Sequence, residues 1–385
     1  MIVSFNRSVP VLFGPGASLR TGMKVRELGV KKVMCVYDKG VESAGISDKI
    51  IDNLKAAGLE VVIFNGVQAD PPDTLMNEAA VLANKWKVDG IVGVGGGSSM
   101  DTAKGINVLL TNPPPISRYY VGSGAPHKPG KTVVLIPTTA GTGSEMTGVT
   151  VVSDSASESK KGVIGPAAVA TLAIVDPELM LGLPPSITAS TGMDAFSHAA
   201  EALTSEGMNP MSDVLAEKAI VLITQNLGKA VRNGSDLEAR TNMAFAALIA
   251  GISFNDSLIH WGHAIAHTLG AHYHIPHGIG CALALPAAIE FVADAVPDKV
   301  ERIAQAMGLS FSRNLSPAKL GSKVAEAIRN MNRELGIPSL KEFKIKEASL
   351  EKIVGGVLTD DGAMFGPKRA SAKQILSMLK EVYKY

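Results

Sequence analysis

The chain has 385 residues, enough for two domains, and its 46% hydrophobic and 19% charged residues are typical of a globular protein. Lys and Arg number 37 against 36 Asp and Glu, a balance that gives no case for nucleic acid or an anionic membrane as the main partner. No stretch reaches the roughly 20 apolar residues that a membrane helix needs, and the first residues lack the pattern of a signal peptide. The two cysteines, Cys35 and Cys281, lie in apolar runs, so we expect free buried thiols and a cytoplasmic protein.

The first half of the chain alternates between short apolar runs and segments with helical periodicity. This alternation predicts an α/β domain built on a parallel sheet with helices on both faces. Residues 2–13 are expected to be extended, and the polar stretch 153–161 is expected to form a surface turn or hairpin. The expected strands are 32–37, 60–64, 89–94, 132–136 and 172–176, and the expected helices are 46–57, 73–87 and 100–110.

The pattern changes after Pro184-Pro185, where convincing strands end and helical periodicity takes over. We therefore expect two domains, an α/β domain over residues 1–185 and an all-α domain over residues 186–385. The expected helices of the second domain are 187–204, 210–231, 235–251, 255–269, 280–294, 297–307, 316–334, 347–354 and 370–383.

Two glycine-rich turns follow strands of the first domain. The segment Gly93–Ser98 follows a strand and opens a helix, where backbone amides and the helix N-terminus favour a phosphate. Its GxGxxS pattern at the third strand differs from the usual dinucleotide fingerprint, and a tight strand–helix turn is the structural alternative. The second turn, Pro137–Ser144, adds the hydroxyls of Thr138, Thr139 and Thr142. Two such turns in one sheet favour a nucleotide over a single phosphate.

Two acidic residues are candidates for the same ligand. Asp38 ends the first strand, where a carboxylate accepts from a ribose 2′-hydroxyl and repels a 2′-phosphate, which favours NAD over NADP. The alternative is an Asp that starts a turn. Asp70 precedes Pro71-Pro72, and it either lines the same groove or serves a plain turn.

Histidines concentrate between Asp256 and Leu285, which holds six of the eight in the chain. A helix over 255–269, ended by Gly270, would place three of them on one face, because they are spaced three and four apart. Pro276 prevents simple continuation, so His277 is expected in a loop or at the start of a new helix. The six are His260, His263, His267, His272, His274 and His277.

A carboxylate and further imidazoles complete a candidate metal site. Asp194 and His198 are four residues apart, hence on one helical face, although a helix cap or surface pair is the alternative. Together with His263 and His277 they offer one oxygen and three nitrogen donors, a set that suits Fe(II) or Zn(II) and leaves room for a substrate oxygen. For His272 and His274 a surface or supporting role is expected, and a second metal site is the alternative.

Five motifs resemble the iron-containing (group III) alcohol dehydrogenase family, and the resemblance covers essentially the whole chain. It implies a Rossmann-like nucleotide domain followed by a helical metal-binding domain, with the metal on Asp194, His198, His263 and His277, in agreement with the spacing. The motifs are GGGSSMDTAK at 95–104, PTTAGTGSE at 137–145, IVDPEL at 174–179, TGMDAFSHAAEA at 191–202 and HAIAHTLGAHYHIPHG at 263–278.

The resemblance also implies roles for individual residues. His267 matches a histidine near the nicotinamide and the substrate that is not a ligand. Family members commonly pair through their N-terminal strands, so residues 2–13 are expected to form a homodimer edge. The expected cofactor contacts are Asp38, Asp70, Gly96, Gly97, Ser98, Asp101, Thr138, Thr139, Thr142, Lys160 and Leu179.

Some residues depart from the family pattern. His260 and Trp261 replace small residues just before His263, and they are expected to reshape the substrate pocket. Gly366-Pro367-Lys368 stands in place of a usual Asn-Pro-Arg. These departures leave the identity of the substrate open.

The expected reaction is hydride transfer between a small primary alcohol or diol, or its aldehyde, and NAD. The metal would act as a Lewis acid on the substrate oxygen, and His267 would relay the proton. The alternatives are transfer from a hydroxy acid to an oxo acid, a lyase resembling dehydroquinate synthase, and a non-catalytic metal or nucleotide sensor.

Overall fold

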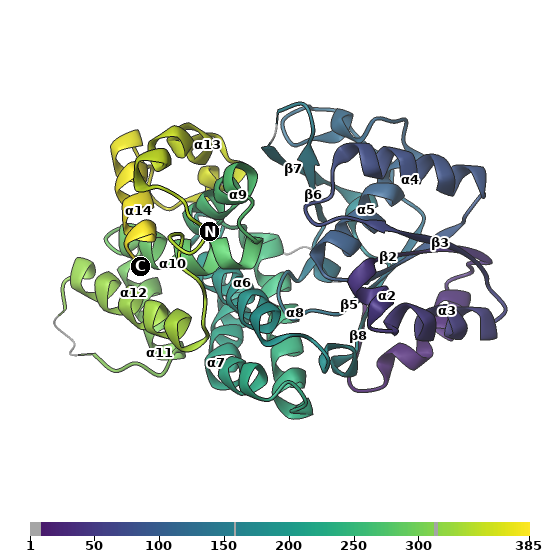
Figure 1. Ribbon diagram of the computed structural model, residues 1–385, viewed down its shortest axis with the longest axis horizontal. Helices are drawn as coiled ribbons and strands as arrows, with labels where there is room; N and C mark the ends of the chain where they lie inside the picture. Colours follow the sequence, from purple (N-terminus) through teal and green to yellow (C-terminus); the bar gives the residue numbers. More distant parts are fainter. Residues whose placement is uncertain (1–8, 158, 312–314) are drawn as a thin grey trace. The chain divides into compact units, whose positions relative to one another are not determined.

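The computed structural model describes residues 9–157, 159–311 and 315–385 (Figure 1). The described chain divides into two compact units. The sheet unit contains residues 9–139 and Gly143–Gly182, and the helical unit contains Ala140–Thr142 and Leu183–Tyr385. The division at Leu183 lies close to the domain boundary expected from the sequence.

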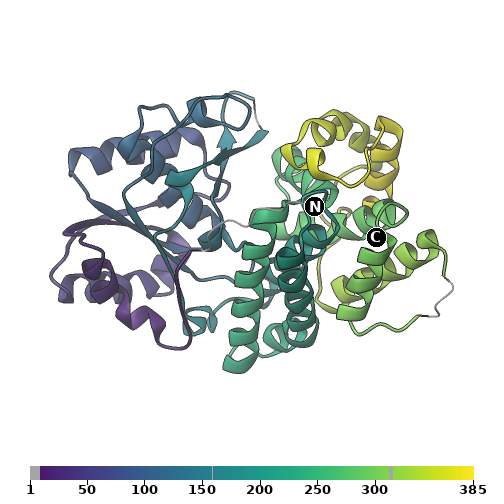
Figure 2. The same ribbon diagram turned by 180° about the vertical axis from the view of Figure 1, so that it is seen from behind.

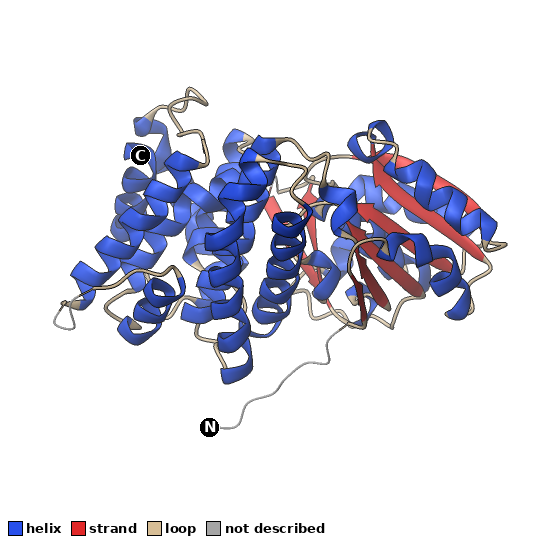
Figure 3. Cartoon of the chain, turned by 90° about the horizontal axis from the view of Figure 1, so that it is seen from below, coloured by secondary structure: helices blue, strands red, loops and turns tan. Residues whose placement is uncertain are grey.

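The sheet unit is built on a six-stranded sheet in which every pairing is parallel. Figure 3 shows its strands in red, with helices beside them. The central strands are almost continuously buried, as expected for a parallel sheet covered on both faces. In spatial order the strands are β1 (Val11–Phe13), β8 (Leu172–Val175), β5 (Thr132–Pro137), β4 (Gly90–Gly95), β2 (Lys32–Asp38) and β3 (Glu60–Val67).

Helices cover both faces of this sheet, as Figures 1 and 2 show, so the predicted α/β class is confirmed. One apolar core joins side chains of α1, α2 and α3 to side chains of the central strands. The sequence missed α1 and α2, because helices of seven and five residues are too short to show a periodic pattern. The helices are α1 (Thr21–Glu27), α2 (Lys39–Ser43), α3 (Ile46–Ala56), α4 (Asp73–Lys85) and α5 (Gly97–Thr111).

An antiparallel hairpin of β6 (Val149–Asp154) and β7 (Ser159–Ile164) extends from the sheet unit. The described residues of the polar stretch 153–161, all except residue 158, form the ends of the two strands and part of the turn between them, as the prediction of a hairpin requires. The two strands themselves were not predicted. Short 3-10 helices connect the remaining elements: η1 (Ala17–Arg20), η2 (Ile116–Tyr119), η3 (Ser144–Met146), η4 (Pro166–Ala168) and η5 (Pro177–Met180).

The helical unit contains no strand in its described part, which confirms the predicted all-α class. A core of alanines and branched aliphatic residues joins α9, α10, α13 and α14. The long helices are α6 (Pro185–Thr204), α7 (Pro210–Arg232), α8 (Leu237–Ser257), α9 (Trp261–Tyr273), α10 (His277–Val292), α11 (Pro297–Ala306), α12 (Pro317–Glu334) and α14 (Ala372–Lys384), and the short ones are η6 (Glu347–Ile353), α13 (Val354–Thr359) and η7 (Asp361–Phe365).

The predicted helix over 255–269 is wrong, because the chain breaks at Leu258, whose φ is 67°. The break separates α8 from α9, and the two helices are bent by 103°. His260 therefore caps α9 and does not share a helical face with His263 and His267. Gly270 does not end α9 either, since His274 takes the left-handed C-cap position with φ 55°.

In the described chain, one bent pair of helices meets the length and composition of a membrane span. No single helix in the described residues is long and apolar enough to cross a membrane. The pair α8 and α9 reaches the required length and composition only when the two helices are counted together. Most residues of both helices are buried in the core of the helical unit.

Candidate functional site

The structure brings the four predicted metal ligands together inside the helical unit. Asp194 and His198 lie one turn apart on α6, His263 lies in the first turn of α9, and His277 opens α10. The Asp194 Oδ1 atom lies 3.4 Å from His277 Nε2, 3.6 Å from His263 Nε2 and 3.7 Å from His198 Nδ1. Three helices thus direct one carboxylate oxygen and three imidazoles at a common point.

The buried atoms at this point suit a divalent metal. Within the described chain, Asp194 Oδ1, His198 Nδ1 and His263 Nε2 have no hydrogen-bond partner, although unpaired buried polar atoms are costly. Burial by itself raises the pKa of Asp194, but the neighbouring His198 and His277 hold that pKa well below its usual range. Burial lowers the pKa of His198 to about 3. An anionic carboxylate and a neutral imidazole are the forms that bind Fe(II) or Zn(II). Burial lowers the pKa of His277, but Cys281 and Asp194 outweigh burial and raise that pKa to about 9, so a metal ion would displace a proton from this imidazole.

Glu201 supports His263 and was missed by the sequence analysis. This fully buried carboxylate on α6 accepts from His263 Nδ1 at 2.5 Å and from the backbone N–H of Gly262 at 2.5 Å. Burial raises its pKa, but His260 and His263 outweigh burial and lower the pKa to about 2. A charged acceptor on Nδ1 fixes the ring so that Nε2 faces the other donors. Glu201 lies three residues after His198 and therefore on the same face of α6, and this spacing could have identified it from the sequence.

His260 belongs to the same group of residues that supports His263. Its side chain is fully buried, its Nε2 lies 2.8 Å from Thr204 Oγ1, and its Nδ1 lies 3.3 Å from Glu201 Oε1. Glu201 also accepts from the backbone N–H of His260 at 3.2 Å and therefore joins His260 to His263. The hydrogen-bond partner of the His260 ring is Thr204.

Two departures from the family pattern pack against each other. Trp261 is buried, and its indole N–H donates to the backbone carbonyl of Lys368 at 2.9 Å. A Cβ added at Gly366 would lie 2.3 Å from Trp261 Nε1. The large indole therefore requires glycine at position 366, so the two departures form one structural change.

His267, the predicted proton relay, has a carboxylate partner. Its Nδ1 lies 3.1 Å from Asp360 Oδ2, and its ring stacks on that of His277 with 5.4 Å between the centroids. Asp360 also accepts from the backbone N–H of Gly362 at 2.9 Å, which fixes the carboxylate. The pair has the arrangement of an oriented general acid–base. Asp360 was missed because it lies 93 residues from His267 in the sequence.

In the sheet unit, the first glycine-rich turn joins β4 to α5. Gly95 has φ 144°, and a Cβ there would lie 2.5 Å from Ser99 Oγ, so the turn requires glycine. Gly96 is the N-cap of α5, and the predicted contacts Gly97 and Ser98 are the first residues of that helix. A helix N-terminus with small residues is a suitable phosphate site.

The second turn follows β5, the neighbour of β4. The backbone N–H of Thr138 donates to the Gly95 carbonyl at 3.0 Å, which ties the two turns together. Among the described residues Thr139 Oγ1 is buried without a hydrogen-bond partner. A Cβ at Gly96 would lie 3.5 Å from this hydroxyl, so the two turns face each other. Thr142 falls in the helical unit.

The hydrogen-bond partners of Asp38 lie within the protein, and they agree with the alternative that Asp38 starts a turn. Its Oδ1 accepts from the backbone N–H of Val41 at 2.9 Å and caps α2, while Oδ2 accepts from Ser99 Oγ at 3.0 Å. The half-buried carboxylate lies at the carboxyl end of β2, where a nucleotide ribose is expected.

Asp101, a predicted cofactor contact, holds a loop of the sheet unit. Its two oxygens accept from Ser144 Oγ at 2.7 Å and from the backbone N–H of Val151 at 3.1 Å, and the residue is buried. Fully buried Lys104 donates from Nζ to Ser144 Oγ at 2.9 Å and to Thr147 Oγ1 at 3.1 Å. Burial lowers the pKa of Lys104 to about 8. The sequence places Lys104 in the motif at 95–104 but does not indicate this role.

The remaining predicted contacts lie apart from the two turns in sequence. Asp70 has φ 49°, and its Oδ1 lies 2.7 Å from Lys160 Nζ, so these two residues form an ion pair. Leu179, in η5, is half-buried against the core of the sheet unit. Asp176 just before it was not singled out, although its oxygens accept from Ser18 Oγ at 2.6 Å and from the Glu178 N–H at 3.0 Å.

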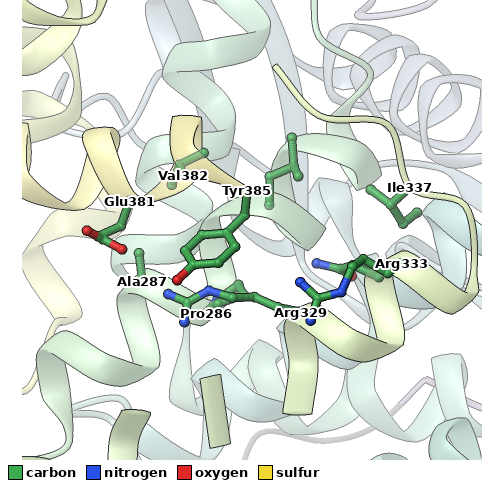
Figure 4. A pocket seen from close by; sticks show the side chains of 10 residues that line it. Pro286, Ala287, Arg329, Arg333, Ile337, Glu381, Val382 and Tyr385 are labelled. Atoms are coloured by element: carbon green, nitrogen blue, oxygen red, sulfur yellow. The ribbon is translucent and has the colours of Figure 1, made fainter. Parts of the chain in front are cut away.

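A small cavity in the helical unit, lined by residues other than the four predicted ligands, does not suit a substrate (Figure 4). Its volume of about 30 Å³ holds one or two water molecules. Arg329 lies over the ring of Tyr385 at 4.1 Å and pairs with Glu290 at 3.1 Å. Arg333 pairs with a glutamate of the same helix at 2.7 Å, so the cationic groups of this cavity already have partners.

The helical unit holds a cluster of oxygen and nitrogen donors that suits a metal, and the sheet unit has glycine-rich turns that suit the phosphates of a dinucleotide. These two features together are typical of an oxidoreductase that uses a metal and a dinucleotide. Residues 9–177 match the family model for iron-containing alcohol dehydrogenase, and residues 188–383 match the C-terminal model of the same family. The chain belongs to the iron-containing alcohol dehydrogenase family.

Individual relatives agree with this assignment. The chain is 38% identical to the NAD-dependent methanol dehydrogenase of Bacillus methanolicus, over 96% of this chain and 97% of that protein. It is 37% identical to the 1,3-propanediol dehydrogenase of Klebsiella pneumoniae, over 96% of each chain. The solved structure of an alcohol dehydrogenase from Oenococcus oeni has a TM-score of 0.94 and 34% identity, covering 99% of this chain and 100% of that one. The predicted family, fold and class of enzyme are therefore confirmed.

Proposed function

We propose that this enzyme interconverts small primary alcohols or diols and their aldehydes, with NAD as the hydride acceptor and a bound divalent metal. The observation that carries the proposal is the convergence of Asp194 with three imidazoles, in which Asp194, His198 and His263 are buried and each has an atom without a hydrogen-bond partner in the described chain. The names of the methanol and propanediol relatives support short alcohols as the substrate class.

Four residues, Asp194, His198, His263 and His277, would hold Fe(II), with Zn(II) as the alternative. The bound metal would supply Lewis acidity, which lowers the pKa of a substrate hydroxyl. Glu201 orients His263 through its Nδ1. His267 accepts the hydroxyl proton, and Asp360 holds its ring in position. The alcohol thus loses a proton to the protein and a hydride to NAD.

The sheet unit would bind NAD through its two turns and the residues beside them. The carboxylate of Asp38 favours NAD over NADP, because a 2′-phosphate would be repelled. Asp101 accepts from Ser144 and from the backbone N–H of Val151, and it would affect NAD binding by fixing the loop that follows the second turn. We assign residues 1–185 to NAD binding and residues 186–385 to metal binding and catalysis. The proposed contacts are Asp38, Asp70, Gly96, Gly97, Ser98, Thr138, Thr139, Thr142, Lys160 and Leu179.

We also propose a cytoplasmic homodimer that pairs through the N-terminal strands. Of the predicted segment 2–13, residues 2–8 lie outside the described residues. In the described part, β1 is at one edge of the sheet, with Val11 38% and Phe13 37% exposed. An apolar edge strand is suited to pairing with a second copy. The free thiols of Cys35 and Cys281 support a reducing compartment. Light scattering on the wild type and on Val11→Lys tests the dimer.

The function is tested by anaerobic NADH formation. Metal-free protein is reloaded with Fe(II) or Zn(II) and assayed with NAD against a panel of short alcohols and diols. We expect NADH from at least one primary alcohol only after metal is restored. Binding of metal and NAD without NADH from any alcohol would contradict the proposal and direct attention to hydroxy acid–oxo acid transfer or a lyase.

A further inference from the structure

A sulfur atom lies against the proposed metal cluster. Cys281 lies four residues after His277, so the two side chains share one face of α10. The Sγ atom is 3.6 Å from His277 Nε2, and the cysteine is fully buried. One ligand atom each from Asp194, His263, His277 and Cys281 all lie within 4.8 Å of one another. Among the described residues these four are thus a compact donor group that includes sulfur.

His198 is placed differently from these four. Its ring stacks on Phe254 with 4.1 Å between centroids and an interplanar angle of 11°, and on His263 at 4.5 Å. Of the residues in the compact group, His198 lies near Asp194, and its Nδ1 atom is 3.7 Å from Asp194 Oδ1. The compact group therefore has one oxygen, two nitrogens and one sulfur, and His198 adds a further nitrogen at its side.

We propose that the thiolate of Cys281 is a ligand of the same metal, in addition to the four ligands that the motifs predict. The inference rests on the metal site of the proposed function and deepens it. Sulfur is a softer donor than oxygen or imidazole nitrogen, and cysteine is a common ligand of zinc. The thiolate would therefore shift the preference of the site from Fe(II) towards Zn(II) and Co(II). A cysteine that only fills space and donates its S–H to His277 would have no such effect.

Cobalt spectroscopy tests for a metal–sulfur bond without relying on turnover. The full chain is loaded with one equivalent of Co(II) under anaerobic conditions, and its absorption is compared with that of Cys281→Ser, Cys281→Ala and Cys35→Ala. Cys35 is a buried thiol in β2 of the sheet unit, which makes it the matched control. We expect a thiolate-to-Co(II) charge-transfer band in the wild type and in Cys35→Ala, and its loss in both Cys281 variants.

Two further measurements make the proposal falsifiable if one variant folds poorly. X-ray absorption of the Zn(II) form should show a sulfur neighbour at about 2.3 Å. Zn(II) affinity should fall at least about tenfold in Cys281→Ser, by more than Fe(II) affinity falls. A metal bound only by nitrogen and oxygen, with a spectrum unchanged by the Cys281 variants, would overturn this proposal and leave the dehydrogenase intact. Failure of the wild type to bind any metal would overturn both.

Discussion

The two units prepare their candidate sites in different ways. In the sheet unit, backbone groups of the turns after β4 and β5 form the candidate phosphate site, while acidic and basic side chains such as Asp101 and Lys104 hold the turns in place. In the helical unit the donors are themselves side chains on three helices, buried except for half-buried His277, and Glu201 supports His263. A change in the helical unit should therefore remove the metal and spare NAD binding, and a change in the sheet unit should do the reverse.

The largest effect is expected for His263→Ala. The variant lacks one of the four proposed metal ligands, and Glu201 stays buried without its imidazole partner. Metal content should fall to background and turnover by about a thousandfold or more, since the metal contributes several kcal/mol of transition-state stabilisation. Metal analysis and NADH formation measure both. The exposed neighbour His272→Ala is the control, and a metallated, active His263→Ala enzyme would refute the ligand set.

The strongest test in the sheet unit is Lys104→Met. Removing this ammonium leaves Asp101 and Ser144 buried without their cationic partner, which costs about 3 kcal/mol of unfolding free energy. The loosened loop should also weaken NAD binding, as measured by calorimetry, while metal content stays at the wild-type level. Exposed Lys85→Met should change neither quantity. Equal loss of metal in Lys104→Met would contradict the division between the units.

Replacing the proton relay should separate chemistry from metal binding. We expect His267→Ala to lower turnover about a hundredfold, because an oriented general acid–base is lost. Metal content should remain intact, and Asp360→Asn should show a smaller loss with an altered pH profile. If His267→Ala also empties the metal site, His267 is a ligand and the assignment of its role is wrong.

Glu201→Gln keeps the shape of the side chain and removes its charge. His263 would lose a charged acceptor on Nδ1, so metal affinity should fall about 10- to 100-fold. Competition with a chelator measures the affinity, and exposed Glu238→Gln is the matched control. Unchanged affinity would mean that Glu201 stabilises only the fold.

The smallest effect concerns pH and Glu145 of η3. Burial raises the pKa of this carboxyl, while a backbone N–H and Lys104 lower it. Burial has the larger effect, so the pKa rises from 4.5 to about 7. The folded protein therefore binds more protons than the unfolded chain between these values. The unfolding free energy should fall as pH rises from about 5 to about 7, by at most about 1.4 kcal/mol per pH unit. Urea unfolding of Glu145→Gln should show a flatter profile, whereas Glu78→Gln should retain the original slope.

Sequence alone predicted the features that depend on local spacing. The strands of the sheet, the glycine-rich turns and the pair Asp194 and His198 follow from periodicity and from residues four apart. The concentration of histidines added His263 and His277 to this pair as further donors, and the family motifs agreed with the same four ligands. Glu201 lies three residues after His198, and Cys281 lies four residues after His277. The sequence therefore places both side chains on the helical faces that carry the predicted ligands.

Features that depend on tertiary structure could not be predicted in this way. Leu258 breaks α8 from α9 although leucine favours helices and rarely adopts a positive φ, so packing overrides its local preference. Asp360 meets His267 only in the folded chain. Likewise, the indole of Trp261 requires glycine at position 366 only because the folded chain packs these two segments together.

The most direct test of the account is a titration of metal-free protein with Fe(II) under anaerobic conditions, with NADH formation from a primary alcohol measured at each step. We predict no activity without metal and a linear rise that stops at one equivalent per chain, because the helical unit offers one donor cluster in its described part. Full activity in the metal-free protein, or none at one bound equivalent, would contradict metal-dependent alcohol oxidation at this site.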